Sequence, residues 1–417
     1  MKRYSAYKDS GVKWIGEIPS HWKIMSLRNF IQLVSEKNHP QETLLSVVRE
    51  QGVIVRNVES KEENHNFIPN DLSNYKLVHK GQFVINKMKA WQGSYAVSEY
   101  TGIVSPAYYT CNLRFKNKEF FNTAIRSKAY IPFFTQYSKG IRVGQWDLAP
   151  VSLKEIPFIC PPENEQDAIV RFLDDKVGKI DHLTDQTTAL IERLKELKQS
   201  VIARAVTRGL DPNAKMKPSG ISWIGEIPEN WEVSKIRSLF RERNEKVSDK
   251  DWEALSVSKD GILPQLSTAV KTDNGDNRKK VCKGDFVVNS RSDRKGSCGF
   301  SDYDGSVSLI NIVLKPINVL GKYYHYLFRS NDYIEEFYRN GRGIVADLWT
   351  TRYSEMRNIA VPLPPISEQK RIADYIEAET SKIDKLIVDK TREVELLKEL
   401  RQRTISDAVT GKIKVTD

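Results

Sequence analysis

The stretch Pro161–Gly209 limits the possible folds of this chain more than any other. It opens with two prolines and then runs for about forty residues without another, which is long enough for a single long helix. Apolar residues and one threonine recur at alternating steps of three and four, the spacing of a coiled-coil seam, at Ile180, Leu183, Thr187, Leu190, Leu194, Leu197 and Val201. A helix of this length cannot bury such a stripe against itself, so the sequence predicts a partner helix of matching length.

The partner is predicted within the same chain, because the stretch occurs twice. A segment that begins at Leu363 repeats many of the same residues 203 positions further on, and its helix is predicted to run to Ala408. Examples are Pro161 and Pro364, Gln166 and Gln369, Asp181 and Asp384, and Leu194 and Leu397. A helix of about 40 residues is about 60 Å long. We therefore expect two long antiparallel helices, each preceded by a domain of its own.

A second repeat stands near the start of each expected domain. Residues Gly11–Leu27 read GVKWIGEIPSHWKIMSL, and residues Gly220–Ile236 read GISWIGEIPENWEVSKI. We interpret the paired tryptophans of this motif as packing residues that fasten the start of each domain to its core. Each motif is followed by strand candidates and then by a helical region, which we place at Lys80–Asn86 and Phe120–Ser138 in the first half and at Lys283–Asn289 and Tyr323–Arg339 in the second.

These repeats predict an α+β protein with an internal duplication and pseudo-twofold symmetry. Two mixed α/β domains are expected, joined by two long antiparallel coiled-coil helices. The predicted boundaries are 1–160 for the first domain, 161–209 for the first long helix, 210–363 for the second domain, and 364–417 for the second long helix with a C-terminal tail.

The composition favours a binding protein over an enzyme. The 417 residues carry a net charge of +11, which is a weak indication of an anionic partner. Phosphate-loop, dinucleotide-binding, HExxH and GxSxG motifs are all missing. The six histidines and four cysteines have no metal-site spacing, so neither a metal nor a cofactor is expected in this chain. Because no apolar run approaches twenty residues and the N-terminus lacks a signal-peptide core, we expect a cytoplasmic protein that does not enter a membrane.

The candidate binding residues lie in a loop that follows the matching strands. Asn86 and Gly93-Ser94 enclose six residues, and Asn289 and Gly296-Ser297 enclose six others, none of which match the first set. A repeated scaffold that displays different side chains is typical of two recognition sites for different targets. The displayed residues suit DNA, because Lys and Arg can contact phosphates or guanine, Gln can contact adenine and Trp can pack on a base. The candidates are Lys87, Lys89, Trp91, Gln92, Ser290, Arg291, Arg294 and Lys295.

A glycine-containing loop later in each domain adds further candidates, namely Arg142, Gln145, Trp146 and Arg342. The surrounding sequence is also basic, since Asn277–Lys295 holds seven basic residues and two acids. Two simpler interpretations remain. The basic loops could be solvated hairpins, and Gly140 and Gly341 could be left-handed helix caps.

Taken together, these motifs resemble the specificity (S) subunit of a Type I restriction–modification system. The resemblance covers nearly the whole chain. It rests on SGxxWIGEIPxxW, on KGxFVxN with its Gly-Ser loop, and on PPxxEQ before a long helix, each present twice and in the same order.

The resemblance implies a non-catalytic subunit whose two target recognition domains each read one part of a bipartite, asymmetric site in double-stranded DNA. It also implies that the helices set the spacing of the two parts and dock two methyltransferase (modification) subunits, which bind S-adenosylmethionine. Restriction subunits that use ATP and Mg would complete the complex. Contacts with partner subunits are expected on the long helices, at Gln166, Leu190, Leu194, Leu197, Gln369, Leu397 and Leu400.

Three alternatives remain open at the level of sequence. A stand-alone coiled-coil DNA-binding protein would bind its site without partner subunits. A protein–protein scaffold would show no salt-dependent affinity for duplex DNA. A divergent nuclease with widely spaced acidic residues would cleave DNA in the presence of a divalent metal.

Overall fold

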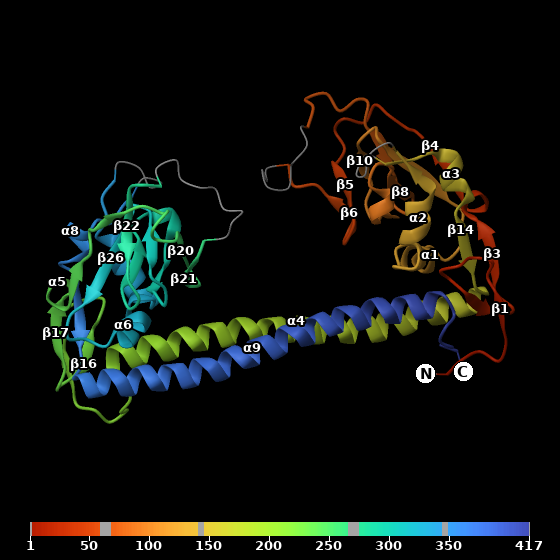
Figure 1. The fold of residues 1–417 in the computed structure, drawn as a ribbon. Helices are drawn as coiled ribbons and strands as arrows, with labels where there is room; N and C mark the ends of the chain where they lie inside the picture. Colours follow the sequence, from red (N-terminus) through yellow and green to blue (C-terminus); the bar gives the residue numbers. More distant parts are fainter. Residues whose placement is uncertain (1, 59–67, 141–145, 266–274, 344–348, 417) are drawn as a thin grey trace. The chain divides into compact units, whose positions relative to one another are not determined.

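The structure is a computed structural model that describes residues 2–58, 68–140, 146–265, 275–343 and 349–416. The chain forms two compact units, each with one globular domain and one end of each long helix (Figure 1). Unit 1 comprises Met1–Thr187 and Arg392–Asp417, and unit 2 comprises Thr188–Thr391. The fold is therefore the expected mixture of α/β domains and paired long helices.

The two long helices are α4 (Glu163–Arg208) and α9 (Ile366–Val409). Each begins directly after the double proline that the sequence repeats. Each ends at a glycine with positive φ, 72° at Gly209 and 74° at Gly411, a backbone conformation that other residues rarely adopt. The repeated sequence signals therefore fix both the start and the end of each helix.

The predicted seam of α4 is wrong at every second position. The residues that face the partner helix are the buried or half-buried Ile180, Thr184, Thr187, Ile191, Leu194, Lys198 and Val201, with Asp181 half-buried at the edge of the seam. Leu183, Leu190 and Leu197 are instead 42%, 40% and 50% exposed. The seam of α9 uses the equivalent positions, Ile383, Ile387, Lys390, Val394, Leu397, Arg401 and Thr404.

Charged residues enter this seam because the partner helix neutralises them. In unit 2, Nζ of Lys198 donates to both carboxylate oxygens of Asp384 at 2.7 Å. In unit 1, Nε of Arg401 donates to Oδ1 of Asp181 at 2.7 Å. The aliphatic stems of Lys and Arg can lie in an apolar seam while their charged ends reach a carboxylate at its edge. Our prediction failed because it assigned only apolar residues and one threonine to the seam.

The domain of unit 1 is built on a four-stranded antiparallel sheet in the order β4-β11-β8-β9. Its strands are β1 (Tyr7–Asp9), β2 (Glu17–Pro19), β3 (Lys23–Ser26), β4 (Ile31–Val34), β5 (Leu45–Val48), β6 (Gly52–Val55), β7 (Lys76–Val78), β8 (Phe83–Asn86), β9 (Tyr95–Val97), β10 (Gly102–Val104), β11 (Tyr108–Leu113), β12 (Ser138–Lys139), β13 (Asp147–Leu148) and β14 (Pro157–Cys160). Its helices are α1 (Lys118–Ile125), α2 (Ile131–Tyr137) and α3 (Pro150–Glu155), with short 3₁₀ turns η1 (Leu27–Asn29) and η2 (Ala90–Gln92).

The domain of unit 2 repeats this sheet in the order β18-β26-β23-β24. Its strands are β15 (Met216–Pro218), β16 (Glu226–Pro228), β17 (Glu232–Lys235), β18 (Phe240–Glu242), β19 (Lys246–Val247), β20 (Leu255–Ser258), β21 (Gly261–Pro264), β22 (Arg278–Val281), β23 (Phe286–Asn289), β24 (Cys298–Phe300), β25 (Gly305–Val307), β26 (Asn311–Pro316) and β27 (Ala360–Leu363). Its helices are α5 (Ile236–Leu239), α6 (Gly321–Phe328), α7 (Asn331–Arg339) and α8 (Tyr353–Met356), with the 3₁₀ turn η3 (Ser292–Arg294). Each predicted helical region is thus a pair of short helices.

Each domain shares one hydrophobic core with the ends of both long helices. In unit 1 the core includes Ile169 and Leu173 of α4 and Ala408 and Val409 of α9. In unit 2 it includes Ile202 and Val206 of α4 and Ile372 and Ile376 of α9. Burial of apolar side chains therefore holds each domain rigidly to its own end of the helix pair.

The tryptophan motif lies at this junction, in agreement with our interpretation of it as a packing motif. Trp22 and Trp231 are both fully buried. Nε1 of Trp22 donates to Oε2 of Glu165, in the first turn of α4, at 2.9 Å. A Cβ placed on Gly411 would stand 3.0 Å from the Trp22 ring, so the same ring packs against the end of α9. One side chain thus contacts the start of one helix and the end of the other.

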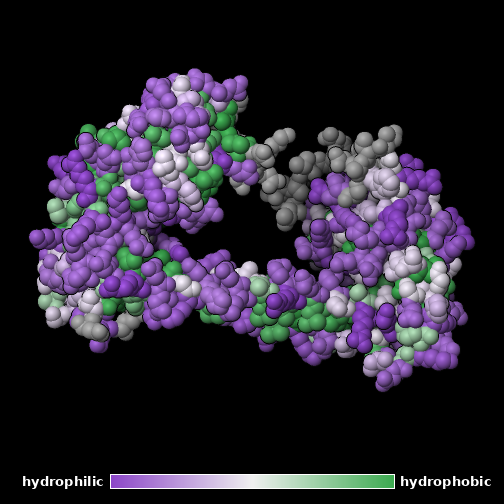
Figure 2. Space-filling view, turned by 180° about the vertical axis from the view of Figure 1, so that it is seen from behind, coloured by the Kyte–Doolittle hydropathy of each residue, from purple (hydrophilic) through white to green (hydrophobic). Residues whose placement is uncertain are grey.

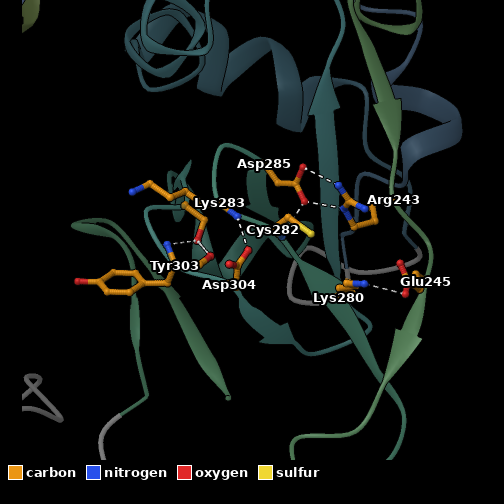
Figure 3. Close-up of polar contacts among 9 residues, drawn as sticks. Arg243, Glu245, Lys280, Cys282, Lys283, Asp285, Tyr303 and Asp304 are labelled. Atoms are coloured by element: carbon orange, nitrogen blue, oxygen red, sulfur yellow. Dashed lines mark hydrogen bonds and ion pairs between the residues drawn. The ribbon is translucent and has the colours of Figure 1, made fainter. Parts of the chain in front are cut away.

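The turn that precedes β23 shows how the repeated KGxFVxN motif is stabilised (Figure 3). The carboxylate of Asp285 accepts from the Cys282 backbone N–H at 2.8 Å and from Nε of Arg243 at 2.6 Å. In unit 1 the equivalent residue is Gln82, whose side-chain oxygen accepts from the His79 backbone N–H at 2.9 Å. The turn is therefore closed in the same way in both units, by a charged pair in one and by an amide in the other.

Candidate nucleic-acid interface

The candidate loop of unit 1 leaves the sheet at the end of β8 and returns at β9. Its two ends are joined by a hydrogen bond from the Asn86 backbone N–H to the Ser94 carbonyl at 2.9 Å. Between them the chain makes the 3₁₀ turn η2 and reverses at Gly93, whose φ is 98°. A side chain at this glycine would be strained, which explains why glycine stands here.

The loop of unit 2 has the same backbone construction between β23 and β24. The Asn289 backbone N–H donates to the Ser297 carbonyl at 2.9 Å, the 3₁₀ turn is η3, and Gly296 has a φ of 79°. We call these two backbone arrangements the loop frames. The frames match, whereas the six residues that each one displays do not.

The chain that follows the later glycine-containing segment of each domain lies beside the loop frame of that domain. In unit 1 the Leu148 backbone N–H donates to the Lys87 carbonyl at 3.1 Å, and in unit 2 the Thr351 N–H donates to the Ser290 carbonyl at 3.0 Å. The rings of Trp91 and Trp146 also pack together, with centroids 5.4 Å apart. The structure thus brings together candidates that are separated by more than fifty residues in the sequence.

Gly341 in the second of these segments is not a left-handed helix cap. Its φ lies outside the positive region, and Asn340, the C-cap residue that follows α7, has a right-handed conformation. A Cβ at position 341 would stand 2.3 Å from Nε1 of Trp349. Glycine is therefore needed for the close approach of the Trp349 ring, and the cap interpretation is wrong at this position.

The candidates of unit 1 differ in their availability. Lys89 is exposed, and Trp91, Gln92 and Trp146 are partly exposed. Lys87 is engaged within the protein, because its Nζ pairs with Oδ2 of Asp147 at 2.9 Å. This hydrogen bond raises the pKa of the Lys87 ammonium, so the ammonium stays charged at neutral pH.

In unit 2, Arg291 and Arg294 are exposed, and the side chain of Arg342 is 85% exposed. The Arg342 and Thr350 backbones exchange two hydrogen bonds of 3.0 Å, which fix this arginine beside the loop frame. Ser290 is buried, and Lys295 pairs with Glu335 at 2.5 Å. Among the candidate residues of unit 2 that the structure describes, the exposed cations are therefore arginines. Arg142 and Gln145 lie outside the described residues.

The basic run before the second loop contributes less to the surface than its sequence suggested. Arg278 is only 5% exposed and donates from Nε to Oγ of Ser306 at 2.8 Å. Lys279 is 9% exposed and pairs with Glu242, while Lys280 pairs with Glu245 and lies over the Trp252 ring. These three cations stabilise the domain, so the count of seven overstated the charge available to DNA.

The residues expected to contact partner subunits fall into three groups. Leu190, Leu197 and Leu400 are 40–50% exposed, and Leu183 and Leu386 are exposed as well. Green areas along the helical part of the molecule in Figure 2 show that hydrophobic residues are exposed there. Leu194 and Leu397 lie half-buried in the helix seam.

Gln166 and Gln369 form the third group, in which both side chains are bonded within the chain itself. They are 5% and 1% exposed, and each donates from Nε2 to the carbonyl of its helix-initiating proline at 2.8 Å, Pro161 for the first and Pro364 for the second. They stabilise the starts of the two long helices and leave no surface for a partner.

No group of His, Cys, Asp and Glu side chains suited to hold a metal ion occurs among the described residues. The described cysteines are unpaired, and burial raises the pKa of the Cys111 and Cys298 thiols to about 12, which makes both unreactive at neutral pH. Within the described ranges, no helix has the length and apolar character needed to cross a membrane.

Comparison with protein families gives a match to the family described as "Type I restriction modification DNA specificity domain" over residues 228–396. The chain is 24% identical to the putative type I restriction enzyme MjaX specificity subunit of Methanocaldococcus jannaschii, over 98% of both chains. It is 25% identical to the type I restriction enzyme MjaVIII specificity subunit of the same organism, over 68% of both chains.

Two solved structures share the fold. One is a chain from a study of complex assembly and conformational transition of the type I R-M system, with a TM-score of 0.70 and 14% identity over 95% of this chain and 99% of that one. The other is the HsdS subunit from Thermoanaerobacter tengcongensis, with a TM-score of 0.53 and 16% identity over 97% of this chain and all of that one.

Proposed function

Because this chain belongs to the family of Type I restriction–modification specificity subunits, we propose that each of its two domains reads one half of a bipartite, asymmetric site in double-stranded DNA. The chain is the DNA-specificity subunit and is itself non-catalytic, since catalysis in this family lies in partner subunits. Members of the family have no cofactor of their own.

The observation that carries the proposal is the match between the two loop frames. The hydrogen bond that closes the frame is 2.9 Å long in both units, and the neighbouring segment attaches to each frame through an equivalent hydrogen bond. None of the six displayed residues is shared. Identical scaffolds that carry different side chains suit two recognition surfaces with different base preferences.

In unit 1 we assign DNA contact to Lys89, Trp91, Gln92 and Trp146. In unit 2 we assign it to Arg291, Arg294 and Arg342. A guanidinium can contact guanine in a bidentate manner, and a glutamine amide can do the same with adenine. Lys87, Ser290 and Lys295 are better suited to support these residues. Ser290 is buried, and Lys87 and Lys295, whose side chains are 30% and 42% exposed, form ion pairs of 2.9 and 2.5 Å. Arg294 and Arg342 also face carboxylates, but at 3.7 Å, and their side chains are 67% and 85% exposed.

We further propose that α4 and α9 set the distance between the two half-sites and dock two methyltransferase subunits. The exposed leucines Leu190, Leu197 and Leu400 support a docking surface on these helices, because side chains of this kind gain free energy when a partner covers them. S-adenosylmethionine would then be bound by the methyltransferase, and ATP and Mg by restriction subunits. The complex would act in the cytoplasm, where genomic DNA is accessible.

An exchange of loops tests the central claim. The residues Lys87–Gln92 would be replaced by the sequence of 290–295, with Asn86 and Gly93 kept, and the full chain would be produced with its methyltransferase subunit. Sequencing of methylated adenines should show one altered half-site and one unchanged half-site. Lys80→Ala, at the opposite end of β8, is the matched control and should leave both half-sites unchanged. A motif that stays unchanged after the exchange, or changes in both halves while the complex assembles, would contradict separate reading by the two domains.

A further inference from the structure

A hairpin in each domain keeps its ends but changes its tip. Strands β5 and β6 are joined by Arg49, Glu50 and Gln51, whereas β20 and β21 are joined by Lys259 and Asp260 only (Figure 1). Leu-Ser-Val precedes and glycine follows the tip in both hairpins. A constant frame with a changed insert is the same pattern that distinguishes the candidate loops.

In both units this tip lies beside the loop frame. In unit 1, Cγ of Arg49 is 3.8 Å from the position that a Cβ on Gly93 would occupy. In unit 2, Lys259 lines a cavity of about 580 Å³ together with Lys295 and Gly296 of the loop frame. Residues on the tip and in the loop could therefore contact one DNA segment.

A half-buried arginine holds the tip backbone in each domain. Nη2 of Arg126 donates to the Glu50 carbonyl at 2.8 Å and to the Arg49 carbonyl at 3.3 Å. Arg329, the equivalent residue 203 positions later, donates from Nη2 to the Lys259 carbonyl. The arginine thus fixes the backbone of the tip, while the Arg49 side chain remains 62% exposed and Lys259 is also exposed.

We propose that the first residue of each tip, Arg49 in unit 1 and Lys259 in unit 2, binds a DNA backbone phosphate next to the bases that the neighbouring loop contacts. The two tips differ in length, but both place a cation first. A cation that is present in both domains suits the phosphate backbone, because the backbone is the same in every DNA sequence. Residues that differ between the domains suit the bases. The inference rests on the proposed function and adds a contact outside the loops and the glycine-containing segments.

Unit 2 offers the cleaner test, because Nε of Arg49 also pairs with Glu50 at 3.0 Å. The variants are Lys259→Glu and Lys259→Arg in the full chain, assembled with its methyltransferase subunits. The matched control is Lys283→Glu, which makes the same charge change at an exposed lysine at the opposite end of β23 (Figure 3). Affinity would be measured by titration of a duplex that carries the methylated motif and of a scrambled duplex, across a range of salt concentrations.

Lys259→Glu should weaken binding of both duplexes by about tenfold, and the slope of log affinity against log salt should decrease by about one. Lys259→Arg should bind like the original protein, and Lys283→Glu should change affinity by less than about threefold. The methylated motif should stay the same in all three. If Lys259→Glu binds with unchanged affinity and salt slope, the tip proposal is wrong, while the loop exchange described above still tests the proposed function by itself.

Discussion

In unit 1, Nε of Arg401 on α9 donates a hydrogen bond of 2.7 Å to Oδ1 of Asp181 on α4. Unit 2 contains the same relationship between Lys198 and Asp384. Lys198 stands 203 residues before Arg401, and Asp384 stands 203 residues after Asp181. Each unit therefore has an ion pair that joins the two long helices at an equivalent position. These pairs specify which turn of α9 lies beside which turn of α4.

Reversal of one charge in this pair should lower thermal stability, and a swap of both charges should restore it. Because Arg401 and Asp181 are 37% and 46% exposed, we expect a coupling free energy of about 1 kcal/mol or less. The four proteins of a double-mutant cycle with Asp181→Arg and Arg401→Asp would be compared by thermal unfolding. A coupling free energy of zero would show that this pair does not specify the alignment of the helices.

His325 should make unit 2 less stable in mild acid. Burial, together with the nearby charge of Arg329, lowers the pKa of His325 to about 4, against the opposing effect of Asp302. The unfolded chain, with a histidine pKa near 6.5, binds a proton that the folded chain excludes between pH 6.5 and about 4. The free energy of unfolding should therefore fall as pH decreases through this window, by up to about 3 kcal/mol.

The equivalent residue of unit 1 supplies the control for this pH dependence. Nδ1 of His325 accepts from the Phe300 backbone N–H at 3.4 Å, and Oδ1 of Asn122 accepts from the equivalent Val97 N–H at 2.9 Å. His325→Asn should keep the acceptor and remove the titrating group. The variant should lose the change in unfolding temperature between pH 6.5 and 4.5 that His325 causes. A profile as steep as that of the original protein would contradict this assignment.

The carboxylate of Glu165 should contribute more to stability than its counterpart in unit 2. It accepts from Tyr4 Oη at 2.7 Å and from Trp22 Nε1 at 2.9 Å, and His21 Nε2 lies 2.5 Å away. Burial raises the pKa of Glu165, but these hydrogen bonds outweigh burial and hold the pKa below its usual value. Glu165→Gln should lower the free energy of unfolding by about 2 kcal/mol at pH 7.

Glu368→Gln is the matched control, because Glu368 accepts only a 3.3 Å hydrogen bond from Asn230, and Nε1 of Trp231 has no partner in the described part of the chain. Glu368→Gln should lower the free energy of unfolding by less than about 1 kcal/mol. A lowered folded pKa means that the contribution of Glu165 is complete above the unfolded pKa, near 4.5, and is lost as pH falls through the folded pKa. The difference between Glu165→Gln and the original protein, measured by chemical denaturation, should shrink in acid. If both variants lowered the free energy of unfolding by the same amount, Glu165 would not contribute more to stability than Glu368.

The sequence predicted the architecture because whole segments recur in order, and segments with the same pattern of turns and apolar positions take the same fold. It could not fix the helix seam, because a leucine or isoleucine is available at both alternatives, as at Leu190 and Ile191. The choice is made by contacts between distant residues, such as Lys198 with Asp384. No pattern local to either helix contains that information.

The candidate interface was predictable only in part for a similar reason. The loop frames follow from repeated Asn and Gly-Ser residues, so their position could be predicted. The sequence could not predict which cations face solvent. Arg278 is bonded to Ser306, and Lys87 is paired with Asp147, and both partners lie far away in the sequence. The hairpin tips could not be predicted for another reason. The tip has three residues in unit 1 and two in unit 2, so the two hairpins cannot be recognised as a repeat until their strands are known.

Substitution of an exposed leucine on α4 should separate partner docking from folding. Leu197 is 50% exposed, whereas Leu194 lies half-buried in the seam. Leu197→Glu should leave the unfolding temperature nearly unchanged and weaken methyltransferase binding by at least about tenfold. Leu194→Glu is the contrasting control and should lower the unfolding temperature, because it buries a charge. If Leu197→Glu assembles with undiminished affinity in a titration followed by size-exclusion chromatography, this face of α4 is not the docking surface.

Insertion of one heptad into both long helices should lengthen the unread spacer of the DNA site without changing either half-site. Seven residues would be added after Leu190 in α4 and after the equivalent Glu393 in α9, so that every seam position keeps its environment. At a rise of 1.5 Å per residue the insertion adds about 10 Å, which corresponds to about 3 base pairs of 3.4 Å each. Methylated-motif sequencing would measure the spacer directly. The same heptad inserted in α4 alone should abolish methylation, because α9 then has no matching turn. A motif that keeps its original spacer when both helices are lengthened would show that the helices do not determine the distance between the half-sites.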